Sequence, residues 1–451
     1  MKLNELFSDK QFYRGLFTIA VPIMLQNLVN SFVNMLDTVM IGRLGTVEIA
    51  AVGLGNQFFF LYNMILFGIC SGGAIFTAQY WGKRDVQGIR KNTGLCLVFS
   101  LGVGSLFTLV SLLFPGEIIG IYSRDPAVIQ TGAVYLRTLA PAYFPYAVSF
   151  VFILILRSIE QVRLAMETSI AALFVNMVLN YMFIFGFGFI PPLGVRGAAM
   201  ATAAARFTEM VILVAVSYAR NYALTGSLRD FLGFNAPFAR RFFRITFPVI
   251  LNELIWALGV TTQNIIMART HTAAIAAFNI TNTVSQLTWV VFIGLGNGAA
   301  VLIGNKIGEG AEKTARDYAS RLTLFAPLVA ALAAFVLIPL SRLLPFFFNV
   351  NDSVFAISSV MFILLSCSYP FRAFNMSMII GVCRAGGDTV FSILYDLVFM
   401  WLVSLPLAAA AAFLFHSPVW LVYLLIIIED PLKVMLGLWR LKTGKWLNRV
   451  T

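Results

Sequence analysis

Residues 21–41 read VPIMLQNLVNSFVNMLDTVMI, an apolar run in which Asp37 is the one acidic residue. A run of about 20 apolar residues is long enough to cross a lipid bilayer as a helix. A charged side chain at that depth costs roughly 3 kcal/mol or more, so it is usually retained for a task such as binding an ion or a proton. The stretch therefore predicts a membrane-spanning helix that carries a functional carboxylate.

Runs of similar length recur along the whole chain of 451 residues, of which 59% are hydrophobic and 12% are charged. Soluble domains carry about 25% charged residues. We therefore predict an all-α membrane protein with twelve transmembrane helices. Their expected positions are 15–41, 49–80, 93–114, 127–156, 166–190, 192–218, 242–268, 275–304, 320–344, 354–382, 389–415 and 417–439.

The chain also repeats itself. A shift of 226 positions places Asp37 on Gln263, so only the first copy retains the acid, and Arg157 matches Arg384 after a slip of one residue. Each copy has six spans, an even number, so each copy begins and ends on the same side of the membrane. This predicts a parallel repeat about a pseudo-twofold axis along the membrane normal. Other matching pairs are Pro22 and Pro248, Arg43 and Arg269, Asn56 and Asn282, and Gly68 and Gly294.

The repeat predicts an N-lobe at 1–218, a cytoplasmic linker at 219–241 and a C-lobe at 242–451. Most of the 32 Lys and Arg residues fall on one side of the membrane when the N-terminus is placed in the cytoplasm. This bias favours cytoplasmic N- and C-termini in a bacterial-type inner (plasma) membrane. The net charge of +12 then indicates contact with anionic lipid and not with nucleic acid. The four Cys residues show no paired spacing, which argues against a disulfide framework.

Several motifs carry a family resemblance. They are VPIM at 21–24, VNMLDTVMIGRLG at 33–45, AMAT at 199–202, NELIWALG at 252–259 and RAGGDT at 384–389. Together they make the chain similar to the multidrug and toxic compound extrusion (MATE) transporters over essentially its whole length. The resemblance implies two six-helix lobes that form a V. It also implies export of cationic, amphipathic compounds in exchange for inward sodium ions or protons.

The first candidate site lies in the N-lobe and consists of Asn34, Asp37, Asn176 and Asn180. Asn176 and Asn180 are spaced i, i+4, so they face the same way on the fifth span. A carboxylate with amide oxygens can bind Na⁺ or hold an exchangeable proton, and in the family the equivalent positions line the ion-binding cavity. The alternatives are a structural acid and interhelical amide bonds. Asn180 stands where some members carry an acid, which leaves Na⁺ and H⁺ both open.

The second candidate site lies in the C-lobe. Glu253, Arg372 and Asp396 are ionisable residues on three different spans, and mutual pairing would offset most of the cost of burying them. We hypothesise that Glu253 and Asp396 bind a cation or the substrate while Arg372 balances their charge. A static salt bridge is the alternative. Na⁺ sites are expected at Asp37 with Asn176 and Asn180, or at Glu253, and no other cofactor is expected.

The sequence also predicts substrate contacts and hinges. Aromatic rings can stack on a cationic drug and amides can supply polar contacts, and Pro inside a helix removes a hydrogen bond and permits bending. Arg206 and Glu209 are expected to pair, and Asp388 to cap the eleventh helix. The candidate substrate residues are Asn56, Tyr143, Asn282, Gln286, Trp289, Tyr369 and Arg372, and the candidate hinges are Pro22 and Pro248.

These observations predict a monomeric, cation-coupled antiporter that exports small organic cations across the bilayer by alternating access. The alternative within the same superfamily is a flippase for lipids or lipid-linked oligosaccharides. An enzyme is not expected, because the sequence has no HExxH or GxSxG motif and its two His residues fall in predicted loops.

Overall fold

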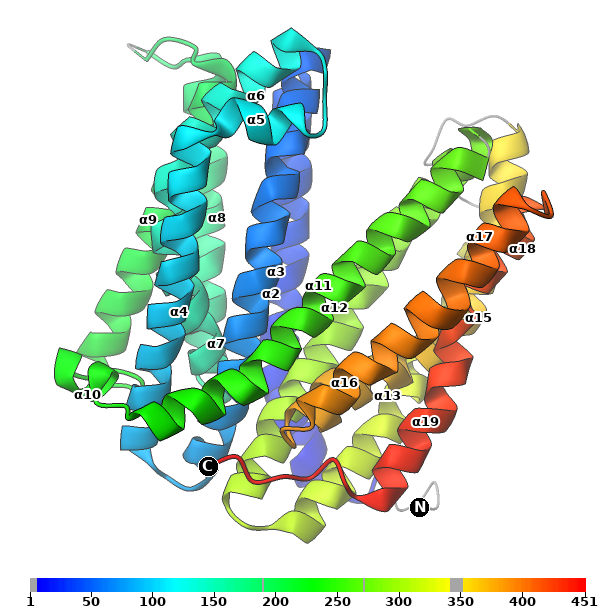
Figure 1. The fold of residues 1–451 in the computed structure, drawn as a ribbon. Helices are drawn as coiled ribbons and strands as arrows, with labels where there is room; N and C mark the ends of the chain where they lie inside the picture. The colour runs from blue at the N-terminus through cyan, green and yellow to red at the C-terminus, as the bar shows by residue number, and fades with distance from the viewer. Residues whose placement is uncertain (1–5, 189, 271, 341–351) are drawn as a thin grey trace. The chain divides into compact units, whose positions relative to one another are not determined.

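The computed structural model describes residues 6–188, 190–270, 272–340 and 352–451, and these residues are almost entirely helical (Figure 1). In this part of the chain the one extended pairing is an isolated bridge between Phe187 and Ile190. The all-α fold class is therefore confirmed.

The first six predicted spans are all helical. The short helix α5 (Pro115–Gly120) lies between the third and fourth spans. The short helix α10 (Leu228–Leu232) follows the sixth span, in the predicted linker. The six spans correspond to α2 (Lys10–Gly42), α3 (Thr46–Gly82), α4 (Val86–Leu113), α6 (Pro126–Leu139) continued by η1 (Ala140–Ala142) and α7 (Tyr143–Ser158), α8 (Val162–Phe185), and α9 (Gly194–Ala219).

The second six spans are helical as well, and two of them contain π-helical segments, η3 and η4. The end of the ninth predicted span, 341–344, lies outside the described residues. The helices are α11 (Ala236–Thr270), α12 (Thr272–Gly308), α13 (Glu312–Leu340), α15 (Asp352–Met376) continued by η3 (Ser377–Arg384), α16 (Thr389–Asp396) continued by η4 (Leu397–Ser404) and α17 (Leu405–Phe413), and α18 (Val419–Ile427) with α19 (Glu429–Thr443).

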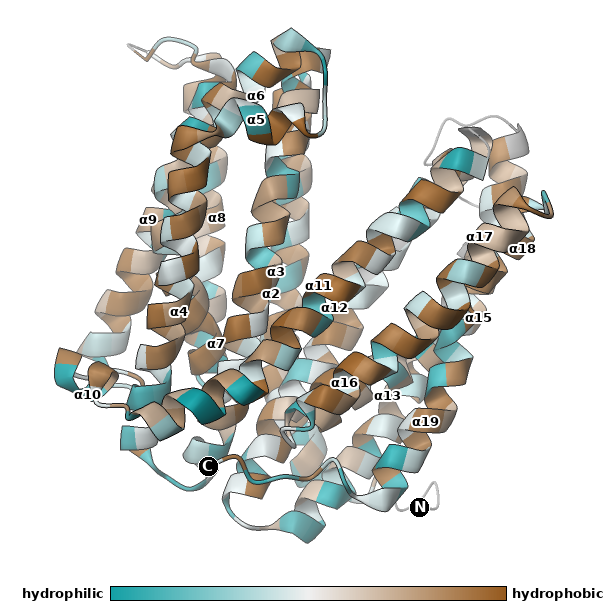
Figure 2. Cartoon of the chain, viewed as in Figure 1, coloured by the Kyte–Doolittle hydropathy of each residue, from teal (hydrophilic) through white to brown (hydrophobic). Residues whose placement is uncertain are grey.

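Apolar residues run along these helices (Figure 2). In the described part of the chain, eleven spans are long and apolar enough to cross a membrane. The twelfth prediction, 417–439, is divided at Ile428 into α18 and α19. Its second part opens with Glu429 and Asp430, which are buried. The last span therefore carries charged side chains into the protein interior.

The backbone reproduces the repeat seen in the sequence. Arg84 (φ 60°) follows α3 and Gly310 (φ 82°) follows α12, 226 positions later. Glu160 (φ 63°) follows α7 and Gly387 (φ 67°) follows η3, 227 positions later. Positive φ is uncommon for residues other than Gly, so its recurrence at matching turns is specific. The two halves of the chain are built on one plan.

The chain divides into two compact units. Unit 1 joins Met1–Met24 to Leu251–Thr451, and unit 2 is Leu25–Ile250. The boundaries fall inside the helices α2 and α11, two residues after Pro22 and two residues after Pro248. Both long helices are therefore divided between the units: α2 up to Met24 belongs to unit 1, and α11 up to Ile250 belongs to unit 2.

Close helix contacts explain the glycine-rich runs. In unit 2, a Cβ placed on Gly68 of α3 would lie 2.6 Å from the Cα of Ile250 in α11. In unit 1, a Cβ on Gly298 of α12 would lie 3.2 Å from the backbone nitrogen of Ala20 in α2. Small residues allow helices in membranes to approach this closely. The first part of α11 thus packs against α3, and the first part of α2 packs against α12.

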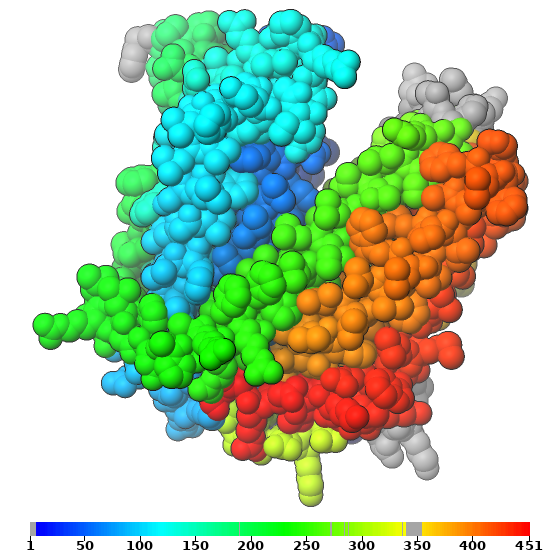
Figure 3. Space-filling model, in the orientation of Figure 1, coloured from blue at the N-terminus to red at the C-terminus, as the bar shows by residue number. Residues whose placement is uncertain are grey.

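The ends of unit 2 are formed by short helices. Figures 1 and 3 show α5 and α6 at one end of the unit and α10 near the opposite end, as expected for loops that alternate between the two sides of a membrane. A capping box defines α10, because Ser227 and Asp230 each bond the other's backbone N–H. The Asp230 carboxylate accepts hydrogen bonds from the Ser227 backbone N–H and from the Ser227 hydroxyl. These two bonds lower the pKa of Asp230, and the backbone bond has the larger effect.

Candidate functional site

Unit 2 contains a cavity of about 550 Å³ that is lined by residues of α2, α3, α6, α7, α8 and α9. Among its described lining residues, Asp37 is the only acid and Arg206 the only base. The cavity collects four of the predicted ion-site residues together with the predicted substrate residue Asn56. Its polar side chains are Asn30, Asn34, Asp37, Thr38, Asn56, Asn63, Tyr135, Tyr146, Asn176, Asn180, Thr202 and Arg206.

Asp37 is held by the pair of amides on α8. The Nδ2 of Asn180 donates to Oδ1 of Asp37 at 2.7 Å and to Oδ1 of Asn176 at 3.2 Å. The Nδ2 of Asn176 in turn donates to the hydroxyl of Thr202 on α9 at 3.4 Å. The spacing i, i+4 on one helix places both amides beside the carboxylate. Three helices thus meet at Asp37.

The same group of residues offers oxygen atoms to a cation. Asn180 is 1% exposed, and its Oδ1 accepts no hydrogen bond from the described residues. Buried polar atoms are usually paired, so an unpaired oxygen beside a carboxylate suits a bound ion or water. Within the described residues no three His, Cys, Asp or Glu side chains form a metal cluster. A Na⁺ ion at Asp37 would therefore be held mainly by amide and hydroxyl oxygens.

Arg206 forms the predicted pair with Glu209, at 3.0 Å from Nη1 to Oε2. Its guanidinium also lies 4.8 Å from the ring centroid of Tyr146, another lining residue. The i, i+3 spacing on α9 indicated the pair, but it gave no sign that Arg206 borders the cavity beside Asp37. The one base of the cavity is thus already neutralised, and Asp37 is left as its uncompensated charge.

A chain of hydrogen bonds continues from Glu209. The hydroxyl of Ser169 donates to Glu209 Oε1 at 2.8 Å, and Gln26 Nε2 donates to Ser169 at 2.6 Å. Arg157 Nη2 donates to Gln26 Oε1 at 2.5 Å. The chain ties α2 to α7, α8 and α9 immediately after the unit boundary in α2.

The other predicted substrate residues lie in several environments. Asn56 accepts a hydrogen bond from Tyr135 at 3.1 Å at the cavity wall. Tyr143 is fully buried in an aromatic cluster and does not line this cavity. In unit 1, Tyr369 packs edge-on against Phe292. The three predicted substrate residues on α12 are spaced i, i+4 and i+7 along the helix. Asn282 is half-buried, Gln286 is exposed, and Trp289 lies against Trp256.

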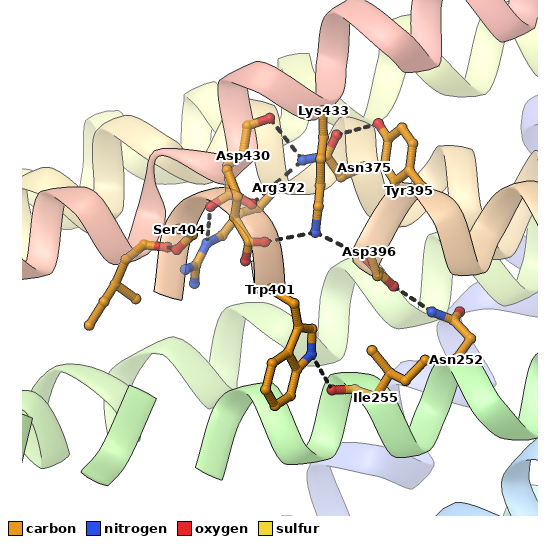
Figure 4. A network of polar contacts seen from close by, with 12 residues as sticks. Asn252, Ile255, Arg372, Asn375, Tyr395, Asp396, Trp401, Ser404, Asp430 and Lys433 are labelled. Atoms are coloured by element: carbon orange, nitrogen blue, oxygen red, sulfur yellow. Dashed lines mark hydrogen bonds and ion pairs between the residues drawn. The ribbon is translucent and has the colours of Figure 1, made fainter. Parts of the chain in front are cut away.

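The predicted group of Glu253, Arg372 and Asp396 is wrong, because each residue pairs with a partner outside it. Arg372 Nε binds Asp430 Oδ2 at 2.7 Å, and Lys433 Nζ binds Asp396 Oδ1 at 2.8 Å. Glu253 pairs with Arg384 at the end of η3. The physical reason for the first two pairs is the polar start of α19, which places its own acid and base next to α15 and α16 (Figure 4).

Amide side chains extend these pairs into a larger polar network in unit 1. Asn252 Nδ2 donates to Asp396 Oδ2 at 2.7 Å, and its Oδ1 accepts from Arg384 Nη2 at 3.4 Å. Asn375 Nδ2 donates to the backbone oxygen of Asp430 at 3.0 Å. Figure 4 shows Lys433 reaching toward Asp396, and Asp396 toward Asn252. Glu253 and Asp396 are therefore connected through Asn252 and not through Arg372.

Four charged members of this network were not predicted as site residues: Arg384, Glu429, Asp430 and Lys433. The internal repeat held the signal. In unit 2, Arg157 bonds Gln26, and Gln26 bonds Ser169. A shift of 227 positions leads from Arg157 to Arg384 and from Ser169 to Asp396. Arg157 had already been matched to Arg384, so Gln26 and Asn252 complete a pattern that predicts the contacts around Asp396.

The predicted cap at Asp388 is also wrong. Asp388 occupies the position before α16, but its side chain makes no capping hydrogen bond. Its carboxylate instead forms a two-bond pair with Arg440, at 2.7 Å and 2.9 Å. An arginine fork matches a carboxylate with two parallel bonds, so it is a stronger partner than one backbone N–H.

Comparison with known proteins places this architecture in a family. The MatE family model matches residues 22–182 and 248–410, one match in each half of the chain. The chain is 24% identical over 441 residues to a probable multidrug resistance protein NorM of Thermotoga maritima, covering 97% of this chain and 93% of that protein. It is 24% identical over 402 residues to the transporter YisQ of Bacillus subtilis, covering 89% and 87%.

A solved structure shares the fold. A mutant of the Vibrio cholerae MATE transporter VcmN superposes with a TM-score of 0.88 at 18% identity, covering 96% of this chain and 97% of that one. The duplicated set of helices, the matching turns and the family model agree with one another. The chain belongs to the MatE (MATE) family of multi-pass membrane transporters.

Proposed function

We propose that this transporter is a cation-coupled antiporter that exports amphipathic organic cations, with Asp37 as the coupling carboxylate. One observation carries the proposal: among the described residues, Asp37 is the only acid that lines the cavity of unit 2. A carboxylate in a membrane span is costly, and transporters use such groups for ions and protons.

Competition for Asp37 would link the two fluxes. An inward-moving cation, Na⁺ or H⁺, neutralises the carboxylate, and an organic cation loses its counter-charge in the cavity. The ligand that binds one state better shifts the protein toward that state. One charge that moves down a membrane potential supplies roughly 2.3 kcal/mol per 100 mV, and a concentration gradient adds to it.

The cavity also suits the apolar part of such a compound. Phe59, Phe60 and Tyr146 line it together with Asp37. Aromatic rings attract cations by roughly 0.5–2 kcal/mol, depending on how far the cation is desolvated. The relatives described as multidrug resistance proteins support this substrate class, as does the mixture of rings and amides, which can adapt to different compounds.

The two prolines fit a role as hinges. Pro22 and Pro248 lie inside the unbroken helices α2 and α11, and each precedes a unit boundary by two residues. Pro removes one backbone hydrogen bond and crowds the preceding turn, so a helix bends there at low cost. Bending of α2 at Pro22 would move Gln26 and Asp37 together, since both lie beyond the proline on the same helix.

The proposal extends to the cellular setting. The transporter would work as a monomer in a bacterial-type inner membrane with both termini in the cytoplasm. Its partners would be small organic cations and the bilayer, with no nucleic acid and no cofactor other than the coupling ion. The excess of Lys and Arg in the predicted cytoplasmic segments supports the orientation.

Uphill efflux of ethidium from proteoliposomes tests the function. The gradient is either sodium or pH, and Asp37→Asn is compared with Asp125→Asn. Asp125 is an exposed residue whose carboxylate caps α6, and Asn can keep that cap. We expect efflux under one gradient for the wild type and Asp125→Asn, and loss in Asp37→Asn. An absence of dye movement under both gradients would contradict drug export and favour a lipid or oligosaccharide flippase.

A further inference from the structure

The charged network of unit 1 does not balance. Within the described residues it holds four carboxylates and three bases. Asn252 links the pairs of Glu253 and Asp396, and Asp430 follows Glu429 in the chain. All seven charged side chains are buried or mostly buried. Fully ionised, the network would carry one uncompensated negative charge. The acids are Glu253, Asp396, Glu429 and Asp430, and the bases are Arg372, Arg384 and Lys433.

The imbalance is located at Lys433. Glu253 has Arg384 as its ion-pair partner, and Asp430 has Arg372. Lys433 instead serves two acids, since its Nζ lies 2.8 Å from Asp396 Oδ1 and 3.0 Å from Glu429 Oε2. Two carboxylates therefore compete for one ammonium group.

Glu429 is the less satisfied of the two acids. Asp396 accepts hydrogen bonds from Lys433 on one oxygen and from Asn252 on the other. Glu429 is 7% exposed, and its Oε2 accepts no hydrogen bond of acceptable geometry from the described residues. A buried carboxylate without a full set of donors is destabilised in its charged form.

Comparison of the halves shows where the extra acid arose. In unit 2 the position that matches Asp396 is Ser169, a neutral hydroxyl that donates to Glu209. Glu209 has its own ion-pair partner, Arg206. The second half has an acid in place of the serine and adds Glu429, so its single lysine is insufficient.

We propose that Asp396 and Glu429 together hold one proton beside Lys433, which makes this cluster a proton-binding site separate from Asp37. Two carboxylates that share a site cannot both ionise easily, and the proton then belongs to the pair. A proton fits better than Na⁺, because the ammonium of Lys433 already occupies the position between the carboxylates where a metal ion would bind. This inference does not rest on the proposed function.

Among the residues that the structure describes, the surroundings of the pair supply no further base. From α11 the pair is faced by Asn252, with Glu253 held by Arg384 of η3. From α15 it is faced by Arg372, which is committed to Asp430, and by Asn375. The Tyr395 ring of α16 lies 6.0 Å from Lys433 Nζ. The remaining nearby pair, Asp388 with Arg440, is balanced within itself.

Infrared difference spectroscopy of the full-length protein in lipid nanodiscs measures the proton directly. Spectra between neutral and alkaline pH report the C=O stretch of protonated carboxylic acids. We expect a band from a buried acid at neutral pH that is lost in Glu429→Gln and in Asp396→Asn, because either change leaves three acids with three bases. The band persists in Asp37→Asn and in the exposed control Glu312→Gln.

Two further variants and conditions complete the test. Lys433→Met removes a base, so we expect a second acid band. Replacement of Na⁺ by choline leaves the wild-type band unchanged. A band that survives both Glu429→Gln and Asp396→Asn would overturn the proposal, as would the absence of any band at neutral pH or a band that grows when Na⁺ is withdrawn. Failure of Glu429→Gln to fold would also overturn it, because glutamine resembles the protonated acid.

Discussion

Gln26 and Asn252 hold matching places in the two units, 226 residues apart. Each accepts a hydrogen bond from an arginine of its own unit, Arg157 or Arg384. Each also donates a hydrogen bond to a side chain on another helix of its unit: Gln26 donates to Ser169, and Asn252 donates to Asp396. The duplication thus preserved the hydrogen-bond geometry while the charges that it connects diverged.

This relationship predicts that Gln26 stabilises unit 2. Gln26→Ala would leave the buried Arg157 without its hydrogen-bond acceptor and would remove the donor to Ser169, at a cost of about 1–3 kcal/mol. Unfolding in detergent, followed by circular dichroism over a denaturant series, measures this loss. The control is Gln130→Ala, since Gln130 is exposed on α6 and its change should be close to neutral. Equal stability of the two variants would contradict the role of Gln26.

The ion pair between Glu253 and Arg384 gives a second prediction. Glu253→Gln leaves the buried Arg384 without its carboxylate, which costs about 3–5 kcal/mol for a buried pair. Combining it with Arg384→Gln removes both charges, so the double variant should be less destabilised than the sum of the two single variants. Strict additivity in the same unfolding assay would show that the pair contributes nothing as a pair.

The repeat was predictable from sequence because its signals are local. Twelve apolar runs have the length of a membrane-spanning helix, and the matched residues Pro22 and Pro248 need no structure to be aligned. The proximity of Asn176 and Asn180 to each other likewise follows from helical periodicity. Their contact with Asp37 came from the family resemblance, since periodicity does not identify which helix faces which.

The network of unit 1 was harder to predict for a physical reason. Ion pairing depends on which helices are neighbours, and Arg372 on α15 pairs with Asp430 of α19 and not with Asp396 of α16. Glu429 and Lys433 fall inside the predicted span 417–439, where their i, i+4 spacing places them on one face. Treating the last span as two helices, one apolar and one polar, would have revealed the missing partners.

Close packing at Gly68 gives a third prediction. Gly68→Ala places a Cβ 2.6 Å from the backbone of Ile250, so α3 and α11 must separate, at a cost of about 1–3 kcal/mol. Gly102→Ala is the matched control, because a Cβ there meets no atom within 4 Å and alanine favours the helix. Thermal unfolding of both variants should show a lower midpoint for Gly68→Ala alone, and a lower midpoint for Gly102→Ala as well would remove the packing explanation.

The most direct measurement of the coupling role of Asp37 is the affinity of the purified protein for ethidium while Na⁺ or H⁺ is titrated. Fluorescence anisotropy reports the dye affinity in the wild type, Asp37→Asn and Asp125→Asn. Because linkage is reciprocal, a cation that competes at Asp37 must weaken dye binding. We predict that one of the two cations lowers the affinity in the wild type and in Asp125→Asn, and that Asp37→Asn loses this dependence while still folding. Dye affinity in Asp37→Asn that responds to the cation as in the wild type would contradict the account.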